Sequence, residues 1–174
     1  MGKVNSKNIL KNILDREKKD DKIIVFTNGC FDILHRGHIR YLKKAKNHGD
    51  ILVIGLNTDS SVKAIKGAGR PIIPGKDRAE ILASLNMVDY VTVFSEKTPY
   101  NLIKFLKPNI LVKGADYRVS EIVGADVVKE NGGKIVRVRL EKGLGTSAII
   151  KKIENCHSER ERGICCRGDP VWSP

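Results

Sequence analysis

The fold of this chain is decided by one stretch, Phe26-Thr27-Asn28-Gly29-Cys30-Phe31-Asp32-Ile33-Leu34-His35-Arg36-Gly37-His38. It starts at the end of an apolar run, Ile23–Phe26, which is typical of a buried strand. A turn at Asn28-Gly29 is expected next, and a helical pattern begins near Gly37. A strand, a glycine turn and a helix N-terminus build many phosphate sites in α/β proteins, because the free N–H groups and the helix dipole attract anions. The stretch therefore predicts an anion site on an α/β fold.

Two histidines, His35 and His38, stand at the predicted helix start with Gly37 between them. Residues spaced by three lie on the same side of a helical turn, so both imidazoles can reach one phosphate. The alternative is an ordinary surface or core pair. The strand and the glycines beside the pair favour the phosphate site.

These residues resemble a known family. His35-Arg36-Gly37-His38, preceded by Gly29-Cys30-Phe31-Asp32, resembles the HxGH signature of the nucleotidylyltransferases related to glycerol-phosphate cytidylyltransferase. The variant found at 27–35 is most similar to the heptose 1-phosphate adenylyltransferases of that family. Four further motifs match in order, so the resemblance runs from about Lys22 to about Ile153.

The expected fold class is α/β. Five apolar strands alternate with helices, which implies a parallel sheet with right-handed crossovers. The predicted strands cover 23–26, 51–56, 90–94, 110–112 and 134–140, and the predicted helices cover 5–19, 37–47, 59–65, 76–86, 99–106, 121–131 and a segment from 146. The strands do not fix their own order. The resemblance implies a Rossmann-like five-stranded sheet of the nucleotidylyltransferase type (adenine nucleotide alpha hydrolase-like), in the order 3-2-1-4-5, with helices on both faces.

A basic glycine-containing loop, Lys66-Gly67-Ala68-Gly69-Arg70-Pro71, follows the second strand. It resembles the lysine-bearing loop that closes over the triphosphate in the family, and the alternative is an ordinary surface loop. Arg78, in the helix after it, matches an arginine of the family, and the alternative there is a surface ion pair.

Two more motifs follow predicted strands. Lys113-Gly114-Ala115-Asp116-Tyr117 lies at the carboxyl end of the fourth strand, where ligands of open α/β sheets bind. K-G-x-D-Y is what the heptose-phosphate adenylyltransferases carry there, and an ordinary turn with a local Asp116 hydrogen bond is the alternative. The segment 143–150 places Thr146 and Ser147 at a helix start, where either could be a cap. It also matches the family motif whose hydroxyls and amides hold the triphosphate.

No Ser-His-Asp or Cys-His nucleophile set is apparent, and direct transfer does not need one. A substrate phosphate can attack the α-phosphorus of ATP in line and expel pyrophosphate, while the protein positions the reactants and neutralises charge. The predicted catalytic residues are His35, His38 and Lys66. The predicted nucleotide-binding residues are Thr27, Asn28, Gly29, Cys30, Phe31, Gly37, Arg70, Arg78, Lys113, Gly114, Asp116, Gly145, Thr146 and Ser147. Asp32 is expected to orient the loop. No metal site is predicted, and Mg²⁺ is expected to arrive with ATP.

The predicted reaction is transfer of AMP from ATP to heptose 1-phosphate, giving an ADP-sugar and pyrophosphate. A cytidylyltransferase for glycerol phosphate or another polyol phosphate is the alternative, as is an adenylyltransferase for another phosphate such as flavin mononucleotide. The resemblance also implies a homodimer. A separate sugar kinase is expected upstream, because no kinase half is recognised in the sequence.

Composition limits the function classes. The chain has 174 residues, enough for one domain, and a net charge of +12 from 32 Lys+Arg against 20 Asp+Glu. The lysines are spread over every predicted helix and only 5% of residues are aromatic, which favours small anionic ligands over nucleic acid. No apolar run reaches the ~18–20 residues of a membrane span, and no secretory signal is seen, so a cytoplasmic protein without a membrane partner is expected. The four cysteines lack a zinc spacing and are expected to be reduced thiols.

Three segments are predicted. Residues 1–21 form an amphipathic helix and a linker, with Ile9, Leu10, Ile13 and Leu14 on one face. Residues 22–153 form the nucleotidylyltransferase domain. The periodicity stops at Asn155, so 154–174 are expected to be an unstructured extension or added sequence without a counterpart in the family.

Overall fold

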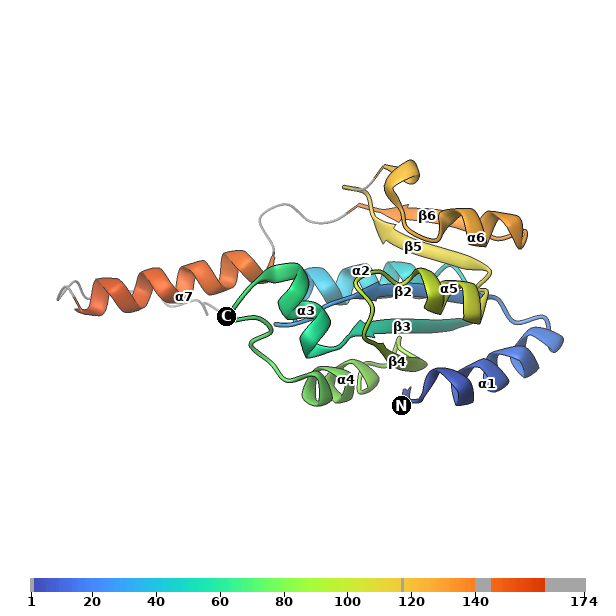
Figure 1. The fold of residues 1–174 in the computed structure, drawn as a ribbon, viewed down its shortest axis with the longest axis horizontal. Helices are drawn as coiled ribbons and strands as arrows, with labels where there is room; N and C mark the ends of the chain where they lie inside the picture. Colours follow the sequence, from blue (N-terminus) through green and yellow to red (C-terminus); the bar gives the residue numbers. More distant parts are fainter. Residues whose placement is uncertain (1, 117, 140–144, 162–174) are drawn as a thin grey trace, which may run out of the picture. The chain divides into compact units, whose positions relative to one another are not determined.

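The computed structural model describes residues 2–116, 118–139 and 145–161. The chain divides into two units, 1–140 and 141–174, and each is described by itself. The first unit holds a parallel sheet with its helices, and the second holds the helix α7 (Figure 1). The predicted division into 1–21, 22–153 and 154–174 stays a prediction.

The sheet has six strands and every neighbouring pair is parallel. The strands are β1 Lys3–Val4, β2 Ile24–Gly29, β3 Ile51–Asn57, β4 Tyr90–Phe94, β5 Ile110–Gly114 and β6 Lys134–Val138. Their order is β1-β4-β3-β2-β5-β6. The prediction of five strands in the order 3-2-1-4-5 is therefore wrong, because a sixth strand, β1, lies beside β4. β1 has only two residues, too few to show any period. Its place is set by backbone hydrogen bonds from Lys3 to Asp89 (3.0 Å) and from Asn5 to Val91 (2.9 Å).

Two strands continue further than their apolar runs. The turn predicted at Asn28-Gly29 is wrong, because β2 stays paired with β3 as far as Gly29 opposite Leu56. β5 continues in the same way through Lys113 and Gly114, beside β6. Residues from two predicted motifs therefore lie on strands, at the carboxyl edge of the sheet.

The described part of the chain contains seven α-helices and one 3₁₀ helix. They are α1 Lys7–Lys19, α2 Arg36–Lys46, α3 Asp59–Lys66, α4 Gly75–Ala83, α5 Tyr100–Leu106, the 3₁₀ helix η1 Val119–Glu121, α6 Ala125–Glu130 and α7 Thr146–Glu161. The helix predicted over 121–131 is divided into η1 and α6, because Gly124 takes a left-handed conformation between them (φ 85°). Helical structure was predicted to end near Asn155, but α7 runs to Glu161. The rest of the predicted extension lies outside the described residues.

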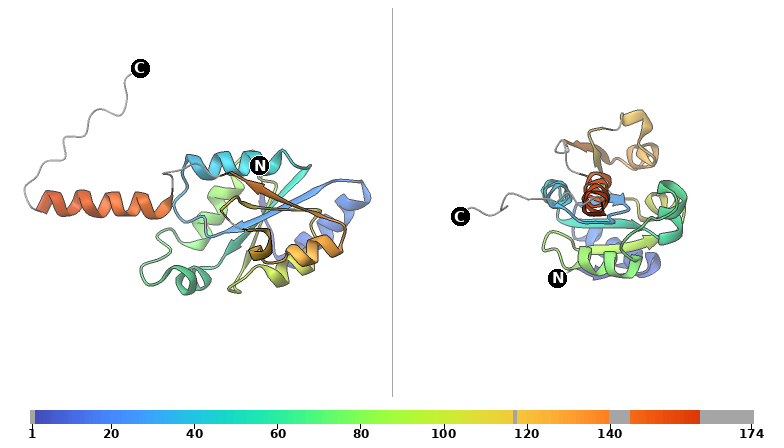
Figure 2. Two further views of the ribbon diagram at one scale, coloured as in Figure 1. Left: turned by 90° about the horizontal axis from the view of Figure 1, so that it is seen from above. Right: turned by 90° about the vertical axis from the view of Figure 1, so that its left-hand side faces the viewer.

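Helices cover both faces of the sheet, as expected. Successive side chains of a strand point to opposite faces, so Val25 and Phe26 belong to different core clusters. Leu42 of α2 and Leu82 of α4 pack in the cluster of Val25, whereas α1, α5 and α6 pack in the cluster of Phe26. In the left-hand view of Figure 2, α2 lies on one side of the strands and α5 and α6 lie on the other. Among the described helices, none is both long and apolar enough to cross a membrane.

Candidate active site

The two predicted histidines lie together where β2 leads into α2. His35 is the N-cap of α2, and its Nδ1 accepts a hydrogen bond from the Gly37 amide at 3.1 Å. The His35 and His38 rings are stacked, with centroids 4.0 Å apart and an angle of 28° between the planes. The spacing of three thus gives one side of a helical turn two parallel imidazoles.

His38 lies deeper than an ordinary surface histidine. Its ring is 5.3 Å from the Phe31 ring, and its Nδ1 is buried without a hydrogen-bond partner within the described part of the chain. Burial and, to a smaller extent, the neighbouring His35 together lower the pKa of His38 to about 4. Burial also lowers the pKa of His35. At neutral pH, the His38 ring is therefore uncharged.

Lys113 reaches the same region from β5, the neighbour of β2. Its half-buried ammonium donates a hydrogen bond to Oδ1 of Asn28. Burial lowers the pKa of Lys113 to about 8, while Asp116 and Cys30 act in the opposite direction. The ends of two strands that are remote in sequence are thereby linked at the carboxyl edge of the sheet, and the lowered pKa makes the charge of Lys113 sensitive to mild alkali.

The pKa of the Cys30 thiol is affected by the positive charges around it. Burial raises the pKa of this thiol, and the charges of Lys66, Arg78 and Arg70 act to lower it, in that order. Lys66 is exposed at the end of α3, so its ammonium faces solvent. Three of the predicted cationic residues therefore act electrostatically on one point of the loop that carries the histidines.

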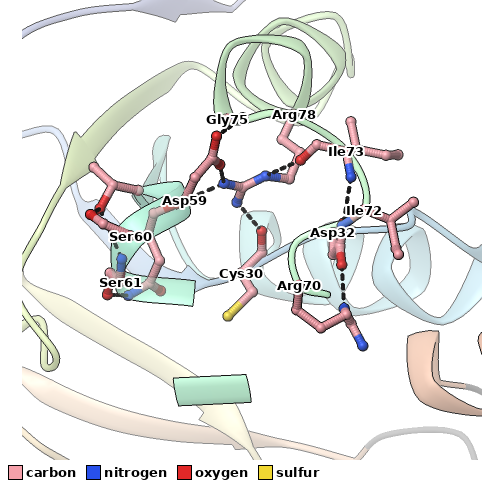
Figure 3. A network of polar contacts seen from close by, with 12 residues as sticks. Cys30, Asp32, Asp59, Ser60, Ser61, Arg70, Ile72, Ile73, Gly75 and Arg78 are labelled. Carbon is pink, nitrogen blue, oxygen red and sulfur yellow. Dashed lines mark hydrogen bonds and ion pairs between the residues drawn. The ribbon is translucent and has the colours of Figure 1, made fainter. Parts of the chain in front are cut away.

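Asp32 joins this loop to the segment after α3. Arg70 donates from Nε to Oδ2 of Asp32 at 2.6 Å, and Oδ1 accepts the amides of Ile72 (2.8 Å) and Ile73 (2.9 Å) (Figure 3). The Asp32 side chain is 1% exposed. Burial alone would raise the pKa of its carboxyl, but the bonds from Ile73, Ile72 and Arg70 outweigh burial and hold the pKa below its ordinary value. Asp32 thus takes the loop-orienting place that was expected from the sequence.

Arg78 lies on the buried face of α4 and is 1% exposed. Its Nε donates to the carbonyl of Ile73 at 2.9 Å, and its Nη2 donates to the carbonyl of Asn57 at 3.1 Å. Nη1 donates to the carbonyl of Cys30, and Nη2 also pairs with Asp59 at 2.5 Å. The structure thus places Arg78 beneath the site, with protein oxygens around its guanidinium. Sequence reasoning missed both the burial of Arg78 and its partner Asp59.

Three of the predicted nucleotide-binding positions, Thr27, Gly29 and Phe31, are closely packed against neighbouring residues. Thr27 is fully buried, and its Oγ1 lies 2.8 Å from the hydroxyl of Tyr41, which donates to the Val112 carbonyl. A Cβ added at Gly29 would lie 3.0 Å from the ring of Phe31, a residue held at φ 44°. The chain at this loop is therefore tightly packed, and Phe31 adopts a backbone conformation that side chains seldom take.

The remaining predicted positions are spread over two units. Gly114 is buried on β5, and Asp116 is exposed just after it. Gly145, Thr146 and Ser147 stand at the start of α7, in the second unit, so their convergence with the histidines stays a prediction. Among the described residues, no group of three or more His, Cys, Asp and Glu side chains could hold a metal ion.

Comparison with known proteins identifies the family. Residues 26–157 match the family model described as cytidylyltransferase-like. The chain belongs to this family. It is therefore a nucleotidyltransferase, which confirms the enzyme class that the HxGH stretch predicted.

Curated relatives cover most of this chain. It is 54% identical over 150 residues to the bifunctional protein HldE of Helicobacter pylori (strain J99 / ATCC 700824), which covers 86% of the chain and 32% of the relative. It is 48% identical over 157 residues to the bifunctional protein HldE of Geobacter sulfurreducens, covering 90% of the chain and 32% of the relative. The chain thus spans about a third of the length of the curated relatives it matches.

Solved structures agree with the fold. The lipopolysaccharide core biosynthesis protein from Thermoplasma volcanium GSS1 is 32% identical, with a TM-score of 0.57, and the match covers 70% of this chain and 98% of that one. A pantoate-beta-alanine ligase from Francisella tularensis has a TM-score of 0.65 at 20% identity, over 100% of this chain and 82% of that one, and shows likeness of fold alone.

Proposed function

We propose that this chain transfers AMP from ATP to heptose 1-phosphate and releases pyrophosphate and an ADP-sugar. The observation that carries the proposal is the stacked pair His35 and His38 at the start of α2, the helix that follows β2, while Lys113 on the adjacent strand binds Asn28 at the end of β2. The similarity to the HldE proteins supports the choice of ATP and a heptose phosphate within the cytidylyltransferase-like family.

The chemistry needs no protein nucleophile. An oxygen of the sugar phosphate attacks the α-phosphorus of ATP in line, the bond to the bridging oxygen breaks, and pyrophosphate leaves. We assign His38 and His35 to hydrogen bonds with the phosphate oxygens, which gain strength as charge develops in the transition state. Lys66 and Arg70 are assigned to the leaving pyrophosphate. Mg²⁺ enters as part of the MgATP substrate.

Two partners belong to the same proposal. A sugar kinase is expected to supply the heptose 1-phosphate, because the reaction begins with a phosphorylated sugar. A homodimer is expected from the family resemblance, and a cytoplasmic location is also part of the proposal. Both expectations are open to direct measurement, the dimer by sedimentation.

The test is pyrophosphate release with MgATP or MgCTP and a panel of phosphates that includes heptose 1-phosphate. Turnover with ATP and heptose 1-phosphate is expected, and His38→Ala should lower it by about 10²–10³-fold, as for loss of one well-placed transition-state donor. His48→Ala is the matched control, because His48 is exposed beyond the other end of α2. Turnover with CTP alone, or with glycerol or flavin phosphate alone, would assign the alternative substrates. Near-normal turnover in His38→Ala would refute the assignment of that histidine.

A further inference from the structure

Two loops at the carboxyl edge of the sheet carry the predicted charges and histidines. The histidine loop is defined here as 30–35, and the lysine loop as 66–74. The first ends at the His35 cap of α2, and the second joins α3 to α4. In the proposed reaction, the first loop would meet the α-phosphate and the second would meet the leaving pyrophosphate. The distance between the loops therefore matters to the chemistry.

Arg78 contacts both loops from below. Its guanidinium donates to the Cys30 carbonyl in the histidine loop and to the Ile73 carbonyl in the lysine loop (Figure 3). The same group reaches the end of β3 through the Asn57 carbonyl and the start of α3 through Asp59. One buried side chain thus connects the histidine loop, the lysine loop and the junction between β3 and α3.

Asp32 makes a second connection between the same loops. It lies in the histidine loop, and its carboxylate binds the amides of Ile72 and Ile73 and the Nε of Arg70. Ile73 is shared, because its amide donates to Asp32 and its carbonyl accepts from Arg78. The two connections therefore meet at one residue of the lysine loop.

We propose that Arg78 and Asp32 are positioning residues that fix the lysine loop against the histidine loop, and that Arg78 does not bind the nucleotide. The proposal rests on the function proposed above. A planar guanidinium suits this place because it donates in several fixed directions at once, whereas an ammonium on a flexible stem cannot span the same oxygens. Asp32 adds direction to Arg70, because a bond at Nε leaves the terminal nitrogens of that side chain for an anionic ligand. The bond to Asp32 thereby fixes the orientation of the Arg70 guanidinium.

The proposal predicts a specific kinetic pattern. Displacement of catalytic groups by about 1 Å can cost about 10²-fold in rate. Arg78→Ala should therefore lower kcat by about 10²-fold while the KM for ATP changes by only a few-fold, since the side chain touches no substrate. Arg78→Lys should behave like Arg78→Ala, because it keeps the charge and loses the fork.

Chemical rescue separates positioning from simple loss of structure. Millimolar guanidinium chloride can occupy the space left in Arg78→Ala and remake the bonds to the Cys30 and Ile73 carbonyls, so it should restore kcat at least tenfold. Ammonium or urea at the same concentration should not. Arg16→Ala is the matched control, because Arg16 is an exposed arginine on α1 and neither its removal nor guanidinium should change the rate.

A second readout does not depend on the reaction. Amide exchange at Ile72 and Ile73 should be faster in Arg78→Ala and in Asp32→Asn, and guanidinium should slow it again only in the first. If Arg78→Ala does not fold, Asp32→Asn carries the test, since it keeps the side-chain shape and should lower kcat more than it changes KM. In the double variant the losses should be less than additive, because both residues act through Ile73.

Two results would overturn the proposal. The first is a rise in the KM for ATP that accounts for the whole loss in Arg78→Ala, which would make Arg78 a nucleotide ligand. The second is unchanged exchange at Ile72 and Ile73 in the folded variants. If the wild-type chain released no pyrophosphate with any substrate but the exchange pattern held, the proposed function would fail and the loop connection would stand.

Discussion

Acid should destabilise this protein through His38 before it reaches the carboxylates. In the folded chain burial lowers the pKa of His38 to about 4, whereas an unfolded chain titrates near the ordinary value of 6.5. Between these values the unfolded state binds a proton that the folded state excludes. The free energy of unfolding should therefore fall as the pH drops from about 6.5 towards about 4, and recover as the pH rises.

The magnitude follows from the two pKa values. At about 1.4 kcal/mol per unit of pH for one proton, the loss between pH 7 and pH 5 is about 2 kcal/mol for a fully shielded ring. His38 is half-buried, so solvent screening brings the expected loss to about 1 kcal/mol. Asp32 does not confuse the comparison. Its pKa is also lowered, so its contribution is lost only below the ordinary carboxylate range.

Urea unfolding of the wild type and of His38→Gln from pH 5 to pH 7.5 measures this effect. Glutamine keeps a neutral polar side chain without a titration, so the variant should lose about 1 kcal/mol less than the wild type over that range. His48→Gln removes an exposed histidine and should follow the wild type. Equal slopes for the wild type and His38→Gln would show that His38 has the same pKa in the folded and the unfolded chain, and the lowered pKa would be refuted.

Three further predictions concern the site and the sheet. If Lys113 binds substrate as a cation, kcat/KM should fall as the pH rises through about 8. Lys113→Arg should move this fall to higher pH, because a guanidinium stays charged. A flat pH profile of kcat/KM in the wild type would contradict the assignment. Gly55→Ala places a Cβ 2.7 Å from Cζ of Phe26 and should lower the free energy of unfolding by about 1–3 kcal/mol, measured by urea unfolding; an unchanged midpoint would show that the ring moves freely. Thr58→Ala removes the acceptor of the Ser61 amide (3.3 Å) and should cost about 1 kcal/mol, whereas Thr58→Ser keeps the hydroxyl and should unfold like the wild type.

The sequence predicted those elements whose signal is local. β4 has the predicted limits, Tyr90–Phe94, because the apolar run sets its own ends. The turn at Asn28-Gly29 was wrong because pairing with β3 overrides the local preference of an Asn-Gly pair. β1 was missed because two residues have no period, and their strand exists only through β4.

The candidate site shows the same limit more sharply. His35 and His38 could be placed together from their spacing, since three residues along a helix set their distance directly. The hydrogen-bond partners of Arg78 could not be predicted in this way, because Cys30 and Asn57 are 48 and 21 residues away in the chain. The sequence placed Arg78 in this helix without predicting its burial, and only the tertiary structure shows that it is buried and which oxygens surround it.

The protonation states at the site follow from how far each group is buried. His38 packs against Phe31 and is partly removed from water, so its pKa is lowered and its ring is neutral near pH 7. Lys66, in contrast, is exposed to solvent. A triphosphate in the proposed site would meet cationic groups from the lysine loop and neutral hydrogen-bonding rings at α2. The net charge of +12 can draw anions from a distance, but it cannot select the reacting phosphorus. In the proposed reaction, that selection would depend on the distance between the two loops, and in this structure Arg78 and Asp32 connect them.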